Sequence, residues 1–530
     1  MKKIISFIII IILFLILFPF LKYDKYDYII KNGIIVDGTG NPWYKADVAI
    51  KNDKIVKIGE LSDEKGSIVI DASNKVVSPG FIDIHTHAGT NILDYPSAHN
   101  YIAQGVTSVV GGNCGGSKTD LNKFFHEIES NGTAVNFGYL IGHNSIRNKV
   151  TGGGNVELTV EQLEEMKTLV DNAMKAGALG LSTGLKYLPG AYTKTEEVIE
   201  LAKVAAKYGG LYVTHLRAEG HGVIEAIREA ITIGEKANIR VEISHLKVLS
   251  VDLWGKSKIL LALIDEARQR GIDVKADQYP YTASSTGIGV LIPPTAFLGP
   301  GLKKNIGIPG KRKEIKKGII YNILHERAGN DFNRIRIATC KFDKNIEGKG
   351  LKDILEERGI SPSVENAAEL VLELQTQGRT SCIYHSISDE DLERIIRHPA
   401  VMHASDGHII EQDEGVPHPR SYGTFPRVLA LYVREKGLLT LEEAIQKMTS
   451  LVAEQIGIND IGLISEGNRA DIVIFDSKKI KDMATWENPH QYPEGIDYVF
   501  VNGSIAVEYG NPKEKRSGRI LQGPGKENKY

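Results

Sequence analysis

In the segment SPGFIDIHTHAG, Ser78 to Gly89, apolar residues lead into His85-Thr86-His87. Side chains alternate along a β-strand, so residues two apart project from the same side. His85 and His87 should therefore project together from the end of a strand. A pair of imidazoles so placed is typical of a metal site, although histidines also serve as hydrogen-bonded core or surface residues. The other strands have to decide between these interpretations.

Seven further segments resemble this one, since each apolar run ends in Gly, Asn, Asp or His. With the first, the eight expected strands lie within residues 76–87, 106–116, 134–144, 178–185, 210–217, 240–247, 273–281 and 400–407. Apolar residues at helical spacing separate several of them, at 160–177, 195–209, 222–238 and 259–271. Eight β-then-α units predict an α/β protein with a (β/α)₈ TIM-like metallo-hydrolase barrel. The alternative, an open doubly wound sheet, would need a GxGxxG phosphate turn, which we do not find.

Both ends of the chain differ from this pattern. Short, β-branched strands punctuated by Gly occur near each terminus, which predicts one small β-sandwich domain built from residues 22–78 and 460–530. The catalytic barrel then occupies residues 79–459. Between its seventh and eighth strands the chain makes a long excursion that must contain structure of its own. We expect an insertion at about residues 284–350, near the mouth of the barrel.

The first 21 residues form a separate segment. Lys2 and Lys3 precede an apolar run, Ile4 to Leu21, that is interrupted only by Ser6 and Pro19. Its length is near the lower limit for crossing a bilayer, and no small-residue cleavage site follows it. This pattern predicts a single-pass N-terminal membrane anchor with the catalytic body outside the cytoplasm. The alternative is a cleaved signal peptide and a secreted protein.

Composition excludes other classes. The 530 residues are 42% hydrophobic and 25% charged, and the formal net charge is −2. This balance gives no basic surface for nucleic acid, so we expect no nucleic-acid partner. Three cysteines do not make a disulfide framework. Nothing in the sequence fixes the oligomeric state.

The ends of the expected strands carry an unusual set of residues. In a barrel, side chains at the C-terminal ends of the strands converge on one site. Besides the histidine pair, these ends carry Cys114, His143, His215, His245 and Asp406. A thiolate with imidazoles suits Zn²⁺ and leaves a coordination position for water. We expect one tightly bound Zn²⁺ at Cys114, His215 and His245 and a weaker second site at His85 and His87, with Asp406 as the catalytic acid–base.

Longer motifs carry a resemblance to a known family. They include PGFIDIHTH, GNCG, GLSTGLKYLPGAY, THLRAEG, ISHLK, DQYPYTASST, SDG, HPRSYGTFPRVL and GLISEGNRADIVIFD. Together they resemble the amidohydrolase superfamily, and in detail its N-acyl-D-amino-acid deacylase (D-aminoacylase) branch. The resemblance implies a zinc-dependent hydrolase that releases a carboxylate and a D-amino acid from a small-molecule N-acyl-D-amino acid. It implies the same metal-ligand set and the same catalytic aspartate.

The resemblance also implies a site for the carboxylate of the amino acid. Lys247, Tyr279 and Arg420 match its cationic and phenolic groups, and an arginine fork pairs well with a carboxylate. His143 stands where relatives vary, and either donates a hydrogen bond to the scissile carbonyl or packs in the core. The roles of His403 and His408, which flank the catalytic aspartate, stay open.

Other activities remain as alternatives. Hydantoinase-like enzymes, which open cyclic amides, carry a lysine on the fourth strand, but here Lys186 comes just after that strand. Deaminases of this fold place a glutamate three residues after a histidine, whereas Glu219 lies four residues after His215. Hydrolysis of N-acyl-L-amino acids or dipeptides is a further alternative. The last is a membrane-tethered metal-binding protein without catalysis, which would not need Asp406.

Overall fold

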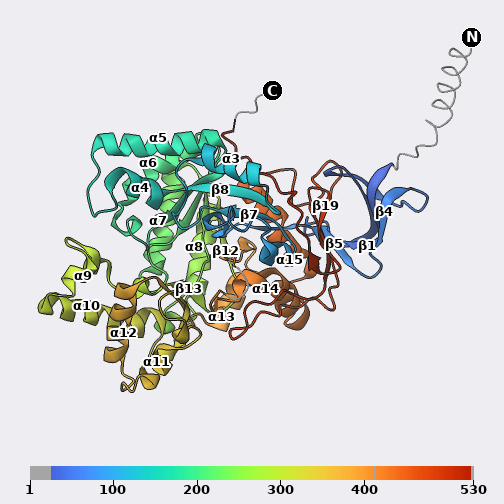
Figure 1. The fold of residues 1–530 in the computed structure, drawn as a ribbon. Helices are drawn as coiled ribbons and strands as arrows, with labels where there is room; N and C mark the ends of the chain where they lie inside the picture. The colour runs from blue at the N-terminus through green and yellow to red at the C-terminus, as the bar shows by residue number, and fades with distance from the viewer. Residues whose placement is uncertain (1–24, 411–413, 527–530) are drawn as a thin grey trace, which may run out of the picture.

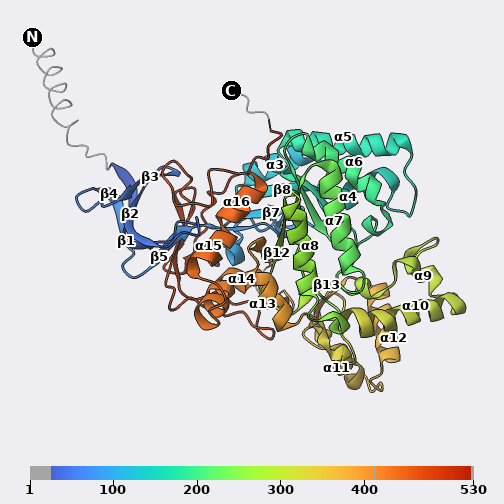
Figure 2. The same ribbon diagram turned by 180° about the vertical axis from the view of Figure 1, so that it is seen from behind.

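The computed structural model describes residues 25–410 and 414–526. They form three units: a (β/α)₈ barrel, a sheet domain made from both ends of the chain, and a unit inserted between two barrel strands (Figure 1). The sheet domain and the inserted unit lie on different sides of the barrel (Figures 1 and 2). The fold class expected from the sequence is confirmed.

The barrel sheet consists of eight strands, and each adjacent pair in the sheet is parallel. In chain order these are β6 (Phe81–Asp83), β7 (Val106–Gly111), β8 (Asn136–Gly142), β9 (Gly180–Gly184), β10 (Leu211–His215), β11 (Arg240–Ile243), β12 (Val274–Gln278) and β16 (Val401–His403). The first and last strands meet just beyond their ends, where the backbone N–H of Asp406 donates to the carbonyl of His85 at 2.8 Å. The N–H of His87 likewise donates to Gly407 at 2.7 Å. Closure of the barrel therefore brings His85, His87 and Asp406 together.

Helices cover the outside of the barrel (Figure 2). They are α2 (His99–Ile102), α3 (Leu121–Asn131), α4 (His143–Thr151), α5 (Val160–Ala176), α6 (Thr195–Ala206), α7 (Val223–Ala237), α8 (Ser257–Gln269), α13 (Asp389–Arg397), α14 (Arg420–Arg427), α15 (Leu441–Met448) and α16 (Ser450–Ile456). The start of α5 shows how the sequence sets these boundaries. The hydroxyl of Thr159 accepts from the backbone N–H of Gln162, and the side-chain oxygen of Gln162 accepts from the backbone N–H of Thr159. This reciprocal pair is a capping box.

The sheet domain joins the two ends of the chain. Its strands are β1 (Tyr26–Ile35), β2 (Tyr44–Lys51), β3 (Lys54–Gly59), β4 (Gly66–Asp71), β5 (Val76–Pro79), β17 (Ile472–Phe475), β18 (Ile496–Val501), β19 (Ser504–Glu508) and β20 (Asn511–Pro512). The N-terminal and C-terminal parts meet where β5 pairs antiparallel with β17. Buried β-branched residues from both parts, such as Ile30, Ile50 and Ile472, fill one core, so neither part would bury its apolar face alone.

The inserted unit lies between β12 and β16 and has a hydrophobic core of its own. It contains a three-stranded antiparallel sheet of β13 (Ser284–Gly287), β15 (Thr380–Tyr384) and β14 (Ile335–Cys340). Its helical segments include α9 (Leu302–Asn305), α10 (Pro309–Tyr321), the π-helical η7 (Asn322–Arg327), α11 (Leu351–Glu357) and α12 (Val364–Gln377). The sheet of this unit includes residues as late as Tyr384, beyond the expected end near residue 350.

The expected membrane localisation requires a correction. Across residues 25–410 and 414–526, no helix is both long enough and apolar enough to span a bilayer. The segment on which the expectation depended, residues 1–21, lies outside the described residues. The single-pass anchor is therefore withdrawn.

Candidate metal centre and active site

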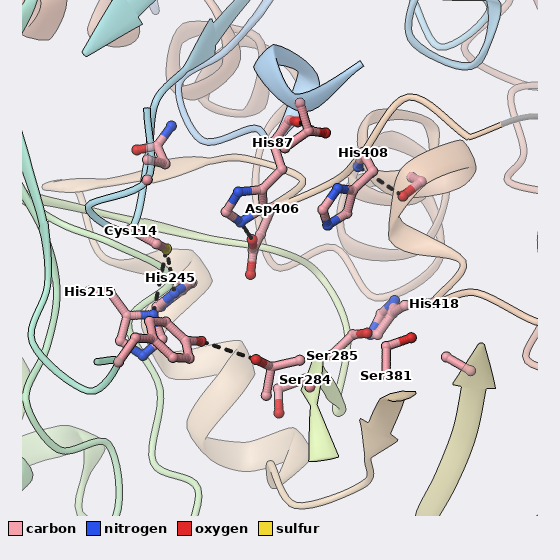
Figure 3. Close-up of a pocket in the computed structure, with 18 of the residues that line it drawn as sticks. His87, Cys114, His215, His245, Ser284, Ser285, Ser381, Asp406, His408 and His418 are labelled. Carbon is pink, nitrogen blue, oxygen red and sulfur yellow. Dashed lines mark hydrogen bonds and ion pairs between the residues drawn. The ribbon is translucent and has the colours of Figure 1, made fainter. Parts of the chain in front are cut away.

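A cavity of about 1100 Å³ opens at the C-terminal ends of the barrel strands. The barrel contributes His87, Cys114, His215, His245 and Asp406 to its lining, and the inserted unit contributes residues from all three of its strands. In the close-up, Cys114, His215 and His245 lie together, with Ser284, Ser285 and Ser381 of the inserted unit across the cavity (Figure 3). The cavity therefore has a barrel wall and an inserted wall.

Three of the predicted ligands converge on one point of the barrel wall. The Sγ atom of Cys114 lies 3.6 Å from Nδ1 of His215 and 3.9 Å from Nε2 of His245. All three atoms lie within 4.8 Å of one another. Tetrahedral Zn²⁺ with ordinary Zn–S and Zn–N bonds would separate sulfur from nitrogen by about 3.6 Å. The donor set and its spacing thus fit a zinc ion with little movement.

The backbone is shaped to bring these atoms together. Cys114 and His245 have φ angles of +53° and +37°, a region that non-glycine residues seldom occupy. Gly184, at the end of β9, packs so closely that an added Cβ would lie 2.2 Å from the carbonyl oxygen of Cys114. Backbone strain of this kind is often found at functional sites. Here it turns the thiol and the imidazole out of the strand direction and into the cavity.

A second potential ligand group shares the same thiol. His85, His87 and Cys114 form another potential metal-binding set, and Nε2 of His85 lies 3.5 Å from Sγ of Cys114. Burial alone would raise the pKa of the thiol, but the adjacent imidazoles outweigh it and hold the pKa well below its ordinary value. The thiolate is the form that binds metal. The thiol can therefore belong to two neighbouring sites.

Two buried carboxylates hold the imidazoles in place, and the sequence analysis assigned a role to neither. Asp277 accepts at Oδ1 from the backbone N–H of His245 (2.9 Å), and its Oδ2 lies 3.1 Å from Nδ1 of His85. Glu219 lies 3.5 Å from Nε2 of His215 and 3.3 Å from Nδ1 of His245. Carboxylates behind ligating histidines fix the ring orientation and the tautomer. The available signals were a glutamate four residues after His215 and an aspartate at the end of the seventh strand.

Asp406 lies beside the second ligand group. Its Oδ1 is 3.0 Å from Nε2 of His87, and its Oδ2 is 2.8 Å from Nη1 of Arg420. Burial favours the neutral acid, but the Arg420 guanidinium and the neighbouring imidazoles outweigh it and hold the pKa of Asp406 well below its usual range. The carboxylate is thus kept ionised and able to accept a proton.

The residues expected to bind the substrate carboxylate surround one aromatic ring. The guanidinium of Arg420 lies 4.8 Å and the ammonium of Lys247 5.8 Å from the ring centre of Tyr279. Among the described residues, the buried hydroxyl of Tyr279 has no hydrogen-bond partner. Lys247 also pairs with Glu219 and lies 2.9 Å from Nδ1 of His245. The structure therefore brings all three side chains to the cavity.

The structure does not bring His143 to the site. Its Nε2 lies 2.8 Å from Oε1 of Glu197, and it does not line the cavity. His408 does line the cavity, where its ring stacks 4.8 Å from that of His87. His403 is fully buried on β16 and is absent from the lining.

The lysine of the hydantoinase-like alternative is not placed to bridge two metals. Lys186 follows β9 and belongs to none of the three potential ligand groups found among the described residues. Its charge interacts with Arg327, Glu326 and Glu219. The potential ligand groups therefore contain a thiol and do not contain this lysine.

Comparison with known proteins decides the family. The sequence profile of the amidohydrolase family matches residues 68–251 and 356–507. The chain belongs to this family. It is 34% identical to an N-acyl-D-glutamate deacylase of Alcaligenes xylosoxydans xylosoxydans, over 94% of this chain and 97% of that protein. A D-aminoacylase of the same organism is 33% identical, over 94% and 98% of the two chains.

A solved structure agrees with this amidohydrolase assignment. It is the N-acyl-D-glutamate deacylase of Bordetella bronchiseptica, complexed with zinc and a phosphonate inhibitor that mimics the tetrahedral intermediate of the reaction. The two chains are 32% identical and superpose with a TM-score of 0.81, over 94% of this chain and all of the other. The resemblance found in the sequence is thus confirmed at the level of family and fold. The chain is an enzyme of a metal-dependent hydrolase family.

Proposed function

We propose that this amidohydrolase cleaves the amide bond of N-acyl-D-amino acids and releases a carboxylate and a D-amino acid. The observation that carries the proposal is the convergence of Cys114, His215 and His245 from three separate strands, with an ionised Asp406 in the same cavity. The similarity to two deacylases over almost the full length supports the choice of substrate.

The ligands fit Zn²⁺ in number, type and spacing. Cys114, His215 and His245 would hold one ion tightly, and His85 and His87 would hold a weaker second ion with the thiol shared between them. When bound, zinc would polarise the amide carbonyl and activate water. Glu219 and Asp277 would keep the imidazoles oriented toward the ion.

The protein itself moves the protons and positions the substrate. Asp406 accepts a proton at Oδ1 from the attacking water and later delivers it to the departing nitrogen. Arg420, Lys247 and the hydroxyl of Tyr279 bind the α-carboxylate and so direct the scissile amide toward Asp406. Because Arg420 contacts both the carboxylate of Asp406 and this binding position, substrate binding and proton transfer are linked through one side chain.

The test is hydrolysis by the purified zinc-loaded protein. N-acetyl derivatives of D- and L-methionine and of D- and L-glutamate would be assayed for release of the amino acid. Hydantoin itself would be assayed for ring opening, and the metal content would be measured in parallel. We expect turnover of the D-enantiomers only. Zinc-loaded protein that prefers the L-enantiomers or hydantoin would contradict the proposal.

A further inference from the structure

One buried cation in the cavity is not used by the proposed reaction. Arg327 ends the π-helical segment η7 of the inserted unit and lines the cavity. Only 5% of its surface is exposed. Its guanidinium lies 5.2 Å from the ring centre of Tyr384, on β15. The side chain is thus packed in the inserted wall and is not a solvated surface arginine.

Among the described residues, the charge of Arg327 has no ionic partner. Within residues 25–410 and 414–526, no carboxylate forms an ion pair with its guanidinium and no oxygen accepts a hydrogen bond from it. The nearby Lys186 also lacks an ion pair among these residues, and its pKa is lowered by burial and then by Arg327. A buried charge without a partner is costly. An unpaired cation in a ligand cavity therefore indicates that the ligand carries an anionic group.

The α-carboxylate of the substrate does not fill this requirement. The positions expected to bind that group surround Tyr279 on the barrel wall, next to Asp406. Arg327 belongs to the inserted wall and stacks on a different ring. The charge of Arg327 also acts on Tyr279, but Arg420, Lys247 and the Tyr279 hydroxyl are already assigned to the α-carboxylate. A substrate with a single carboxylate would therefore leave a surplus cation in the cavity.

We propose that Arg327 binds a second carboxylate of the substrate, so that the enzyme prefers dicarboxylic N-acyl-D-amino acids. This inference rests on the proposed function and narrows its substrate class. The second carboxylate can come from an acidic side chain or from a dicarboxylic acyl group. The two deacylases compared above, for D-glutamate and for D-amino acids in general, differ by one percentage point in identity to this chain, so overall similarity does not choose between them.

The experiment compares substrates that differ in whether, and where, they carry a second carboxylate. kcat/KM would be measured for N-acetyl-D-glutamate, N-acetyl-D-glutamine and N-succinyl-D-glutamine with the wild-type enzyme and with Arg327→Met and Arg327→Lys. Arg334→Met is a matched control, because Arg334 also stacks on a ring of this region, Trp254 at 5.8 Å, but does not line the cavity. Zinc content and Tm would be recorded for each variant.

We expect the wild type to prefer a dicarboxylic substrate by about 10- to 100-fold, as charged hydrogen bonds to a buried arginine allow. Arg327→Met should remove this preference and change turnover of N-acetyl-D-glutamine by less than about threefold, while Arg327→Lys should keep part of it. The preferred substrate of the wild type, D-glutamate or succinyl, identifies the source of the second carboxylate. Arg334→Met should leave the preference intact.

Two results would overturn the inference. One is wild-type enzyme without preference for either dicarboxylic substrate. The other is an equal loss on charged and neutral substrates in a folded, zinc-loaded Arg327→Met variant, which would place the α-carboxylate at Arg327. If no N-acyl-D-amino acid is hydrolysed, the proposed function fails. The anion site is then tested by calorimetry, which compares the affinities of N-acetyl-D-glutamate and N-acetyl-D-glutamine for the wild type and for Arg327→Met.

Discussion

Arg420 and Arg327 are both almost fully buried and line the same cavity, but they come from different walls. Arg420, at the start of α14, lies 2.8 Å from Asp406 and also donates to the carbonyl of Ser285 at 3.3 Å. Arg327, in the inserted unit, contacts an aromatic ring and has no ion pair among the described residues. On the barrel wall, the buried cations Arg420 and Lys247 are paired with carboxylates before substrate arrives, whereas Arg327 on the inserted wall is not.

This contrast follows from what each wall must do. Groups that transfer protons or hold metal have to be fixed in advance, because reorganisation during the reaction would raise the barrier. A group that selects among substrates discriminates best when only the correct substrate supplies its missing ionic partner. A substrate without that partner leaves a buried charge unpaired, which weakens its binding. The barrel wall is thus expected to set the rate and the inserted wall the choice of substrate.

The largest effect should come from Asp406→Asn on the barrel wall. The amide cannot accept the proton of the attacking water, so kcat should fall by about 10³-fold. The zinc content, measured by mass spectrometry, should remain that of the wild type, and the ratio of KM values for N-acetyl-D-glutamate and N-acetyl-D-glutamine should not change. Turnover within tenfold of wild type would exclude Asp406 as the acid–base.

Cys114→Ala should reduce the affinity of the barrel wall for zinc. Loss of a tight ligand should lower zinc affinity by more than about 100-fold, and activity should fall with the bound zinc. Equilibrium dialysis against a zinc chelator measures this directly. Cys382→Ala is the matched control, because Cys382 is buried in the core of the inserted unit. If both variants keep zinc equally well, Cys114 is not a ligand.

Arg420→Ala should affect binding and pH dependence together. kcat/KM should fall by about 10- to 100-fold for substrates with a free α-carboxylate and much less for their α-amides. The guanidinium helps to hold the pKa of Asp406 low, so its removal raises that pKa and moves the acid limb of the pH–rate profile to higher pH.

A full pH–rate profile of wild type and Arg420→Ala on both substrate types measures both effects. Equal losses on acids and amides would count against a carboxylate site at Arg420. An unmoved acid limb would show that the charge of Arg420 does not act on Asp406.

The sequence was sufficient to predict which candidate ligands meet on the barrel wall, because they follow a periodic rule. His85, His215 and His245 stand at the ends of apolar strands, and the barrel gathers such ends at one rim. Asp277 and Glu219 stand near the same ends, but their role depends on contacts with imidazoles of other strands, which spacing along the chain does not reveal. Arg327 lies in an irregular helix inside the insertion, where no hydrophobic period indicates which side chains face the cavity.

His143 shows where the strand-end rule fails. It follows β8 directly and is the first residue of α4, so helical geometry rather than strand alternation sets its direction. The side chain points to Glu197 on α6, whose carboxylate also lies 3.1 Å from Nε of Arg147. The same residue type at the same kind of position thus becomes part of a buried hydrogen-bonded cluster between helices.

His143→Ala should therefore have the smallest effect on catalysis. We expect kcat/KM within about threefold of wild type, because the residue does not line the cavity. Stability should fall by about 1–3 kcal/mol, since a buried carboxylate loses one of its partners while Arg147 remains. Thermal or denaturant unfolding of the zinc-loaded protein measures the second effect and steady-state kinetics the first. A large loss of activity at unchanged stability would instead place His143 in the reaction. The catalytic groups that are fixed in advance would then include one at the end of the third barrel strand.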